Sequence, residues 1–403
     1  MPRRARHAVQ FVREERQPTL DELEWLVSPE GDEACLAMST DAPADTPAAI
    51  ARWRERLAPE HVSAAWAQVT LRQKAKAKFT HAGKMLFDRV GLEQATDDVV
   101  AAYKAKRFAD CGSVVDFCCG VGGDALGIAQ HADVTVLDWS EARTFMAKHN
   151  AGVYGHIVET AVGDAAFDHP RADAAHIDPD RRADGPRRHD PAEGSPDLDV
   201  LHRIVEKYKH VAIKLSPGAS LDRLGIDGEY ELISLGGDCK QLVVWTGKLK
   251  TIARRATLLP SGATLAVEAD ESLFWPASAI AKPGMFLHEP DSAVVRANLV
   301  GPLARREHLS PLDPRIAYLV GDHQSDSPLC KAFRVIDTAA WSVRTARRWL
   351  KGHDVGSLDI KTRGFAGSPE ELIKSLRLQG SQKRVLMLTR VADKPLAILA
   401  DRA

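Results

Sequence analysis

The sequence contains few cysteines, and their spacing suits neither a metal site nor a disulfide framework. The six cysteines of this 403-residue chain include no Cys-x-x-Cys pair, and two of them, Cys118 and Cys119, are adjacent. No metal site is therefore expected, and reduced buried thiols are the usual state of such cysteines in a cytosolic protein. The segment from His288 to Asp291 offers too few ligands, too poorly spaced, for a metal. We expect a loop there.

Long apolar runs are also missing. No stretch approaches the roughly 18 apolar residues that a membrane-spanning helix needs, so no membrane contact is expected. The amino terminus, MPRRARHAVQFVREERQ, is basic and lacks the apolar core of a secretory signal. With 44% hydrophobic and 27% charged residues, the chain has the composition of a globular protein of two or three domains. We expect it to be cytoplasmic.

The net charge is close to zero but unevenly distributed. Residues 311–403 contain 16 lysines and arginines against 10 acidic residues, so that this segment carries +6 while the whole chain carries −1. The rest of the chain is therefore slightly acidic. A basic C-terminal segment suggests a surface adapted to a polyanion.

The most informative stretch is VVDFCCGVGGDALGIA, residues 114–129. Its pattern predicts a buried strand, a glycine turn that lets the backbone approach a ligand, and the start of a helix. Carboxylates on both sides of this turn, Asp116 and Asp124, would repel a pyrophosphate and favour a ligand with a cationic amino group. S-adenosylmethionine carries such a group. An ordinary strand-to-helix turn is the alternative, because glycine motifs also occur without a ligand.

Acidic residues also end the strands that follow. Asp138 comes 22 residues after Asp116, close to the roughly 20-residue interval of an acid that binds ribose hydroxyls in α/β nucleotide-binding units. Asp164 and Asp178 end two further strands. The pattern predicts an α/β fold with a mostly parallel sheet, helices on both faces and ligands at the carboxyl ends of the strands. Strands are expected near residues 113–117, 134–138, 158–162, 174–178, 210–215, 231–235 and 241–246.

Four segments are expected along the chain: a helical region (1–109), the α/β domain (110–250), a β-rich connection (251–310) and a small α+β domain (311–403). Thr19 and Glu22 form a capping box before the first helix, and residues 28–47 have the composition of a linker. Residues 71–84 are basic. They form either a solvated helix face or a group of cations that contacts substrate phosphates. Short strands are expected at 263–269 and 272–275, and in the last domain strands at 332–336, 356–361 and 384–389 with helices at 339–351 and 369–378.

Four segments resemble the motifs of class I S-adenosylmethionine-dependent methyltransferases. DFCCGVGGDALGIA is similar to the first motif, VLDWS to the second, GDA to the third and HIDPDRR to the fourth. A closer resemblance, over nearly the whole chain, is to a bacterial family of these enzymes with a C-terminal THUMP-like domain. It is carried by KFTHAGKMLF, GLEQATDDVVAAY, DPDRR, AYLVGD, VGSLDIKTRG and VLMLTR. FCCGVGGDALGIA is also similar to the cofactor loop of trimethylguanosine synthases, which methylate a guanine exocyclic amine. The resemblance implies a Rossmann-like sheet, an N-terminal helical region and a THUMP-like module that binds RNA.

The resemblance also implies roles for individual residues. The cofactor S-adenosyl-L-methionine would be bound by Asp116, Cys118, Gly120, Gly122, Gly123, Asp124, Asp138, Asp164 and Thr96. Thr96 has an alternative role as a helix cap. Asp178 and Pro179 would orient the acceptor.

Basic residues near the fourth motif would contact the substrate. Many amine-methylating enzymes of this class carry an aromatic residue after Asp-Pro-Pro, whereas this chain has Asp180, Arg181 and Arg182 after Asp178 and Pro179. Guanidinium groups bind phosphate and stack on bases. Arg181, Arg182 and Lys214 are therefore expected to bind substrate, with a strand cap as the alternative role of Lys214.

The sequence thus predicts a methyltransferase that acts on structured RNA, such as tRNA or rRNA, with a guanine amine as the first candidate acceptor. A small-molecule or protein acceptor is one alternative. A non-catalytic RNA-binding protein with a methyltransferase-like fold is another, and nicotinamide dinucleotide binding is a third.

Overall fold

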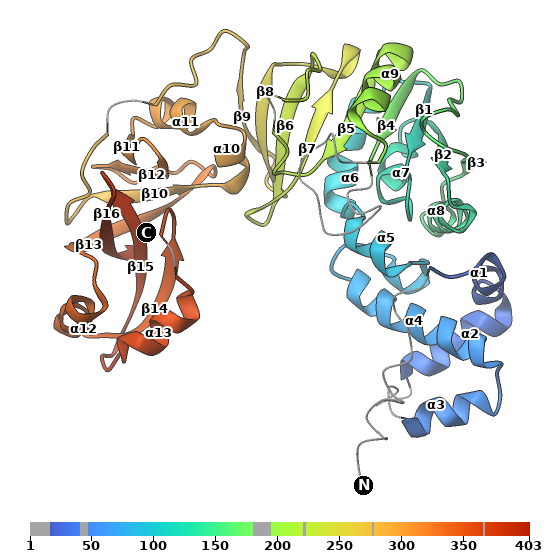
Figure 1. The fold of residues 1–403 in the computed structure, drawn as a ribbon, viewed down its shortest axis with the longest axis horizontal. Coiled ribbons are helices and arrows are strands. Elements are labelled where there is room, and N and C mark those ends of the chain that lie inside the picture. Colours follow the sequence, from blue (N-terminus) through green and yellow to red (C-terminus); the bar gives the residue numbers. More distant parts are fainter. Residues whose placement is uncertain (1–16, 41–46, 180–194, 221–222, 276–277, 366) are drawn as a thin grey trace. The chain divides into compact units, whose positions relative to one another are not determined.

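The computed structural model describes residues 17–40, 47–179, 195–220, 223–275, 278–365 and 367–403. The predicted substrate residues Arg181 and Arg182 lie outside the described residues. The chain divides into two compact units (Figure 1), one of residues 1–228 with 243–251 and one of residues 229–242 with 252–403. The four segments expected from the sequence divide the chain more finely than this.

The first unit begins with helices. Helix α1 (Leu20–Leu26) starts at the predicted capping box, because Thr19 Oγ1 accepts the Glu22 N–H and the Glu22 carboxylate accepts the Thr19 N–H. The prediction of a linker after it was wrong: α2 (Pro29–Thr40) is a helix that packs on α4 and buries Ala34, Cys35 and Met38. Its helix-forming interior outweighs the polar residues at its ends. The other helices before the sheet are α3 (Pro47–Arg54), α4 (Pro59–Ala75), α5 (Arg89–Gln94) and α6 (Asp98–Ala105), with short 3-10 turns at Ala82–Lys84 and Lys106–Phe108.

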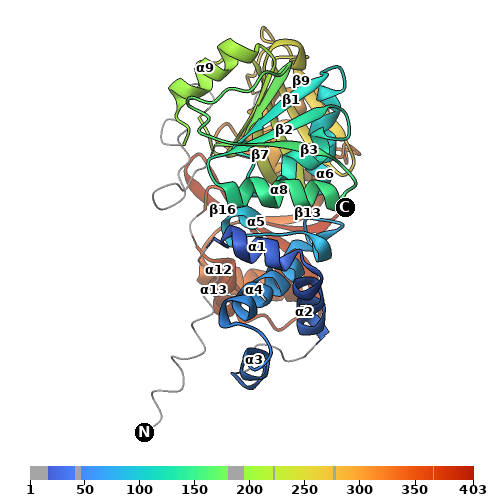
Figure 2. The ribbon, with the colours of Figure 1, turned by 90° about the vertical axis from the view of Figure 1, so that its right-hand side faces the viewer.

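Five parallel strands follow, in the spatial order β3-β2-β1-β4-β5. They are β1 (Ser113–Phe117), β2 (Asp133–Asp138), β3 (Val158–Val162), β4 (Ala174–Ile177) and β5 (Val211–Leu215), as predicted. Strands β4 and β5 are buried along their whole length, as in a parallel sheet covered on both faces. Helices α7 (Gly123–Ile128), α8 (Glu141–Val153) and α9 (Leu198–Tyr208) follow β1, β2 and β4, and α8 packs on β2 and β3 (Figure 2).

The sheet has nine strands in all, in the order β3-β2-β1-β4-β5-β7-β6-β8-β9. The added strands are β6 (Glu229–Leu235), β7 (Asp238–Trp245), β8 (Arg254–Leu259) and β9 (Ala263–Val267), with a 3-10 turn at Gly247–Leu249. Strands β8 and β9 pair in antiparallel orientation at one edge of the sheet. The predicted strand at 272–275 was wrong, since these residues lie in irregular structure.

The second unit also contains a seven-stranded sheet in the order β11-β12-β10-β13-β16-β15-β14. Its elements are β10 (Phe286–Pro290), α10 (Ser292–Arg296), α11 (Val300–Arg306), β11 (Ser310–Asp313), β12 (Ile316–Gly321), β13 (Cys330–Ala340), α12 (Val343–Gly352), β14 (Val355–Thr362), α13 (Pro369–Leu376), β15 (Gln382–Val391) and β16 (Lys394–Arg402). The predicted α+β pattern is confirmed. The loop expected at His288 was wrong, because this residue lies in β10, which pairs with β12 and β13.

Candidate functional site

A cavity of about 800 Å³ lies in the first unit, where the parallel strands end. This volume is typical of a pocket for a nucleotide-sized ligand. Its walls come from α5 and the loop after it, from the turns after β1, β2 and β3, from the ends of β4 and β5, and from the start of α9. The cavity-lining residues are Val90, Gly91, Gln94, Ala95, Thr96, Cys118, Cys119, Gly120, Val121, Gly123, Asp124, Leu137, Asp138, Trp139, Arg143, Gly163, Asp164, Ala165, Ala166, Asp178, Ser195, Pro196, Asp197, Val200 and Lys214.

The glycine turn forms the floor of this cavity. Gly122 stands before α7 with φ of +85°, a conformation that favours glycine. At Gly123 an added Cβ would lie 3.0 Å from the carbonyl oxygen of Thr96. Substitution at Gly123 would therefore displace the loop between α5 and α6. The turn and this loop are packed backbone to backbone.

Asp138 lies at the end of β2 in the cavity wall, as predicted. Its carboxylate accepts the N–H of Gly120 at 3.2 Å and the N–H of Ser140 at 3.0 Å. The side chain is buried, and burial raises the pKa of Asp138. Asp138 thus ties the glycine turn to the second motif. Asp164, after β3, is exposed at the cavity wall, and its carboxylate accepts the Ala166 N–H.

Asp116 occupies a different place from the other acids. It is only 1% exposed, lies outside the cavity lining, and its Oδ1 forms a hydrogen bond of 2.6 Å with Nδ1 of His176. Burial raises the pKa of Asp116. Its carboxylate therefore holds the imidazole behind the cavity wall, and the expected direct contact of Asp116 with the cofactor remains a prediction.

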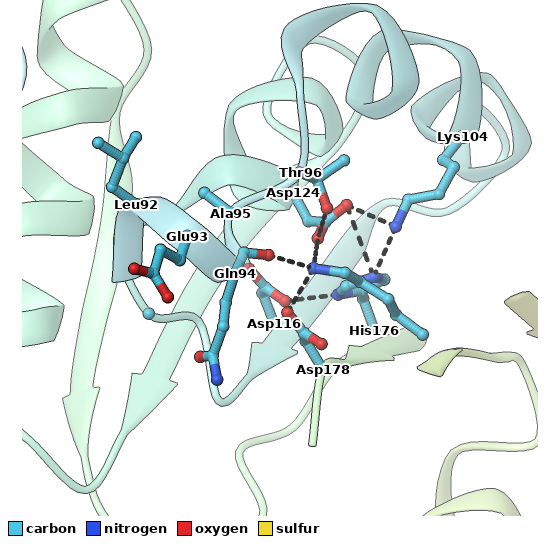
Figure 3. Close-up of polar contacts among 12 residues, drawn as sticks. Leu92, Glu93, Gln94, Ala95, Thr96, Lys104, Asp116, Asp124, His176 and Asp178 are labelled. Carbon is cyan, nitrogen blue, oxygen red and sulfur yellow. Dashed lines mark hydrogen bonds and ion pairs between the residues drawn. The ribbon is translucent and has the colours of Figure 1, made fainter. Parts of the chain in front are cut away.

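Asp124 is the centre of a largely buried cluster of polar and charged side chains, of which Figure 3 labels all but Lys214. The cluster consists of Thr96, Lys104, Asp116, Asp124, His176, Asp178 and Lys214. Its carboxylate lies 2.5 Å from Lys104 Nζ and 3.5 Å from Lys214 Nζ, and it accepts the Thr96 hydroxyl at 2.7 Å. Burial acts to raise the pKa of Asp124, but the nearby ammonium groups outweigh it and hold the pKa well below its usual range. Asp124 therefore presents an ionised carboxylate at the cavity. The alternative role of Thr96 as a helix cap is not seen, since Asp97 is the N-cap of α6.

Asp178 and Lys214 form an ion pair in the same cluster. Lys214 Nζ lies 2.5 Å from Asp178 Oδ2 and donates to the Gln94 carbonyl at 3.1 Å. Asp178 is 21% exposed and lines the cavity, whereas Lys214 is 4% exposed. Pro179 is buried and lies outside the cavity lining. The ammonium of Lys214 is bound to protein oxygens, so the contact with substrate phosphate expected of it remains a prediction.

The basic stretch at 71–84 supports the backbone around the cavity. Arg72 is buried, and its Nε donates to the carbonyl of Met85. Lys78 Nζ donates to the carbonyls of Leu92, Glu93 and Ala95 at 2.9–3.0 Å, at the C-terminal end of α5. Cations at a helix C-terminus satisfy its unpaired carbonyls. These two side chains thus bind carbonyls of the protein itself.

Three residues of the site were not predicted from the sequence: Trp139, Lys104 and His176. Trp139 is 72% exposed and lines the cavity. It directly follows Asp138 in the second motif, and this position could have identified it as a site residue. Lys104 and His176 are 72 residues apart, and their contact at 3.2 Å follows only from the fold.

Within the described ranges, no group of three or more histidine, cysteine or acidic side chains is arranged to hold a metal ion. No helix in the described part of the chain is long and apolar enough to cross a membrane.

Comparisons with known proteins agree with this architecture. Residues 111–178 match the family described as RNA cap guanine-N2 methyltransferase, residues 330–402 match the THUMP domain-like family, and residues 19–75 match a domain of unknown function. An uncharacterized S-adenosylmethionine-dependent methyltransferase, found in two strains of Mycobacterium tuberculosis, is 35% identical over 316 residues, which cover 76% of this chain and 85% of the relative.

A solved structure shows the same fold. A protein of Porphyromonas gingivalis W83 assigned as a methyltransferase superposes with a TM-score of 0.70 at 22% identity, covering 88% of this chain and 98% of that one. The predicted resemblance is thus confirmed by the sequence relative, by the matched families and by the fold. The chain belongs to the S-adenosylmethionine-dependent methyltransferases and carries a THUMP-like domain at its C-terminal end.

Proposed function

We propose that this methyltransferase acts on structured RNA and methylates a base nitrogen, with a guanine amine as the first candidate. The observation that carries the proposal is Asp178. It stands in the cavity wall at the end of the segment that matches the RNA cap guanine-N2 methyltransferase family. The THUMP-like domain and the +6 charge of residues 311–403 support RNA as the partner.

The cavity fits the cofactor in chemistry and in size. Asp138 offers a carboxylate to ribose hydroxyls, and the ionised Asp124 offers one to a cationic group. When bound, S-adenosylmethionine supplies a methyl group on a sulfonium. Gly120 and Gly123 line the cavity, so that the backbone of the turn can approach the ligand closely.

The protein contributes orientation and proton handling. An in-line displacement is accelerated mainly by holding the acceptor in position. The carboxylate of Asp178 accepts an N–H of the acceptor, which directs the nitrogen lone pair away from Asp178 and toward the methyl group. After transfer the same carboxylate is placed to receive the proton.

The test is transfer of a labelled methyl group to total tRNA and rRNA, followed by digestion to nucleosides. We expect label in a base-methylated guanosine, and RNA affinity that falls at least about tenfold between 50 and 200 mM salt because phosphate contacts release counterions. Label in a protein or small-molecule fraction alone would overturn RNA as substrate. RNA binding without any transfer would support the non-catalytic alternative.

A ribose hydroxyl is the second candidate acceptor. The specific observation that favours it is the ammonium of Lys214 beside Asp178, since a cation stabilises a developing alkoxide. The nucleoside digest separates the two candidates, because a 2′-O-methylated product would overturn methylation of a base nitrogen.

Trp139 offers a planar surface for a base at the rim of the cavity. We expect Trp139→Ala to lower the affinity for S-adenosylhomocysteine about tenfold, since stacking on an aromatic side chain is worth roughly 1–3 kcal/mol per base. Calorimetric titration measures the change. Phe167 is 80% exposed and outside the cavity lining, so Phe167→Ala is the matched control. Equal affinities of the two variants would count against a base at Trp139.

A further inference from the structure

Lys214 is buried at the point where the cofactor side and the acceptor side of the cavity meet. Its ammonium contacts Asp178 Oδ2 at 2.5 Å, Asp124 Oδ2 at 3.5 Å and the Gln94 carbonyl at 3.1 Å. These partners come from the end of β4, from α7 and from the end of α5. One side chain thus connects three walls of the cavity.

The two oxygens of Asp178 differ in their surroundings. Oδ2 is bound by Lys214, whereas Oδ1 has no hydrogen-bond partner among the residues that the structure describes. Asp178 lines the cavity and is partly exposed. One oxygen is therefore fixed and the other is available to a ligand.

The charges explain why a cation is needed at this place. Asp124 and Asp178 both line the cavity and both have a carboxylate oxygen within 3.5 Å of the Lys214 ammonium. Like charges near one another repel in a partly desolvated site. The ammonium between them offsets this repulsion. Lys104 neutralises Asp124 from the other side at 2.5 Å, but it lies outside the cavity lining.

We propose that Lys214 is a positioning residue for the acceptor: it holds Oδ2 of Asp178 so that Oδ1 receives the acceptor N–H. This inference rests on the proposed function, in which Asp178 orients the acceptor. Lys214 acts through Asp178 and does not itself touch the reacting atoms.

Ligand binding tests this without any turnover. Sinefungin is an analogue of the cofactor in which an amine-bearing carbon replaces the methyl-bearing sulfonium, so that its ammonium reports the charge near the acceptor. Calorimetry gives its affinity relative to that of S-adenosylhomocysteine. We expect Lys214→Met to raise this ratio about tenfold, because Asp178 loses its counter-ion, and Asp178→Asn to lower it about tenfold.

Lys104→Met is the matched control, because it removes the same charge from Asp124 without touching Asp178. We expect it to change the ratio by less than about threefold. A Lys214→Met ratio within twofold of wild type, or equal to that of Lys104→Met, would overturn the inference. Lys214→Gln, which keeps hydrogen-bond donors, replaces the methionine variant if that protein does not fold.

Turnover provides a second readout. We expect Lys214→Met to lower kcat for RNA methylation about 30-fold, and its combination with Asp178→Ala to be no slower than Asp178→Ala alone, because residues that act as one unit are not additive. Additive losses would contradict an action through Asp178. If the wild type methylates no RNA, the proposed function fails and the affinity ratio still decides the role of Lys214. If RNA is methylated but the ratio does not move, only the role of Lys214 fails.

Discussion

Replacing Asp178 by alanine should lower kcat for methyl transfer about 10³-fold and leave the affinity for S-adenosylhomocysteine within threefold. Positioned groups that accept a proton or orient the attacking atom contribute typically 10²–10⁴-fold. In the proposed function Asp178 contacts the acceptor, whereas Asp138 and the glycine turn contact the cofactor, and all of them line the cavity. Single-turnover methylation and calorimetry measure the two effects separately.

Asparagine at the same position separates two roles of Asp178. Asp178→Asn keeps an oxygen that accepts a hydrogen bond but cannot take a proton, and we expect a loss of about tenfold because hydrogen bonds to neutral groups are weaker than those to charged ones. A loss as large as that of Asp178→Ala would indicate a base. Asp199→Asn, on an exposed residue in the first turn of α9, controls for the lost charge. Full activity of Asp178→Ala would refute the proposed acceptor site.

The sheet and its ligand edge could be predicted from the sequence because the signals are local. Runs such as Val134–Leu137 lack charged residues and are followed by an acid, so each predicts both a buried strand and its carboxyl end. Parallel pairing then places Asp138 and Asp178 at the same edge of the sheet. Both line the cavity.

The contacts within the site could not be predicted in the same way. Lys104 and Lys78 stand in helices and turns with ordinary polar composition, and nothing in the sequence separates a buried cation from a solvated one. In the structure, Lys104 is bound to Asp124 and Lys78 to the end of α5. Buried cations require such partners, which only the fold supplies. Arg72 and Lys78 of the basic stretch 71–84 bind carbonyls of the protein, and a contact of this stretch with substrate phosphates remains a prediction.

The wrong predictions about the fold have a related cause. Residues 29–40 combine polar ends with an apolar face, and the residues that α2 buries against α4 became visible only through packing. Strand β10 contains Pro290 and two polar residues, which argue against a strand, yet it lies between β12 and β13. In β10, pairing with the neighbouring strands outweighs local preference.

Thr96 shows how the two halves of the site depend on one another. Its hydroxyl binds Asp124, and its carbonyl packs on Gly123, so the loop after α5 is fixed to the glycine turn. Lys214 binds the same loop at Gln94 and also binds Asp178. Because Asp124 and Lys214 contact several elements of the cavity wall, their variants are expected to affect cofactor and acceptor binding together. Residues with fewer contacts across the cavity separate the two better.

Asp138 is such a residue, and its replacement by alanine should weaken binding of S-adenosylhomocysteine about 30-fold. The carboxylate is placed for ribose hydroxyls, and each hydrogen bond to a charged group is worth about 1.5–3 kcal/mol. The variant also releases the Gly120 N–H, which loosens the glycine turn. Calorimetric titration of the purified variant measures the loss.

Two further variants separate the loss of charge and the loosening of the glycine turn from the loss of the ribose contact. Asp133→Ala removes the same charge from the exposed start of the same strand, and we expect its affinity to equal that of the wild type. Asp138→Asn keeps an acceptor for Gly120 and supports the turn, so an affinity between those of the wild type and Asp138→Ala is expected. If Asp138→Ala unfolds at the wild-type temperature and still binds with wild-type affinity, the cofactor is not held at the end of β2. The cofactor would then have to bind in another part of the cavity.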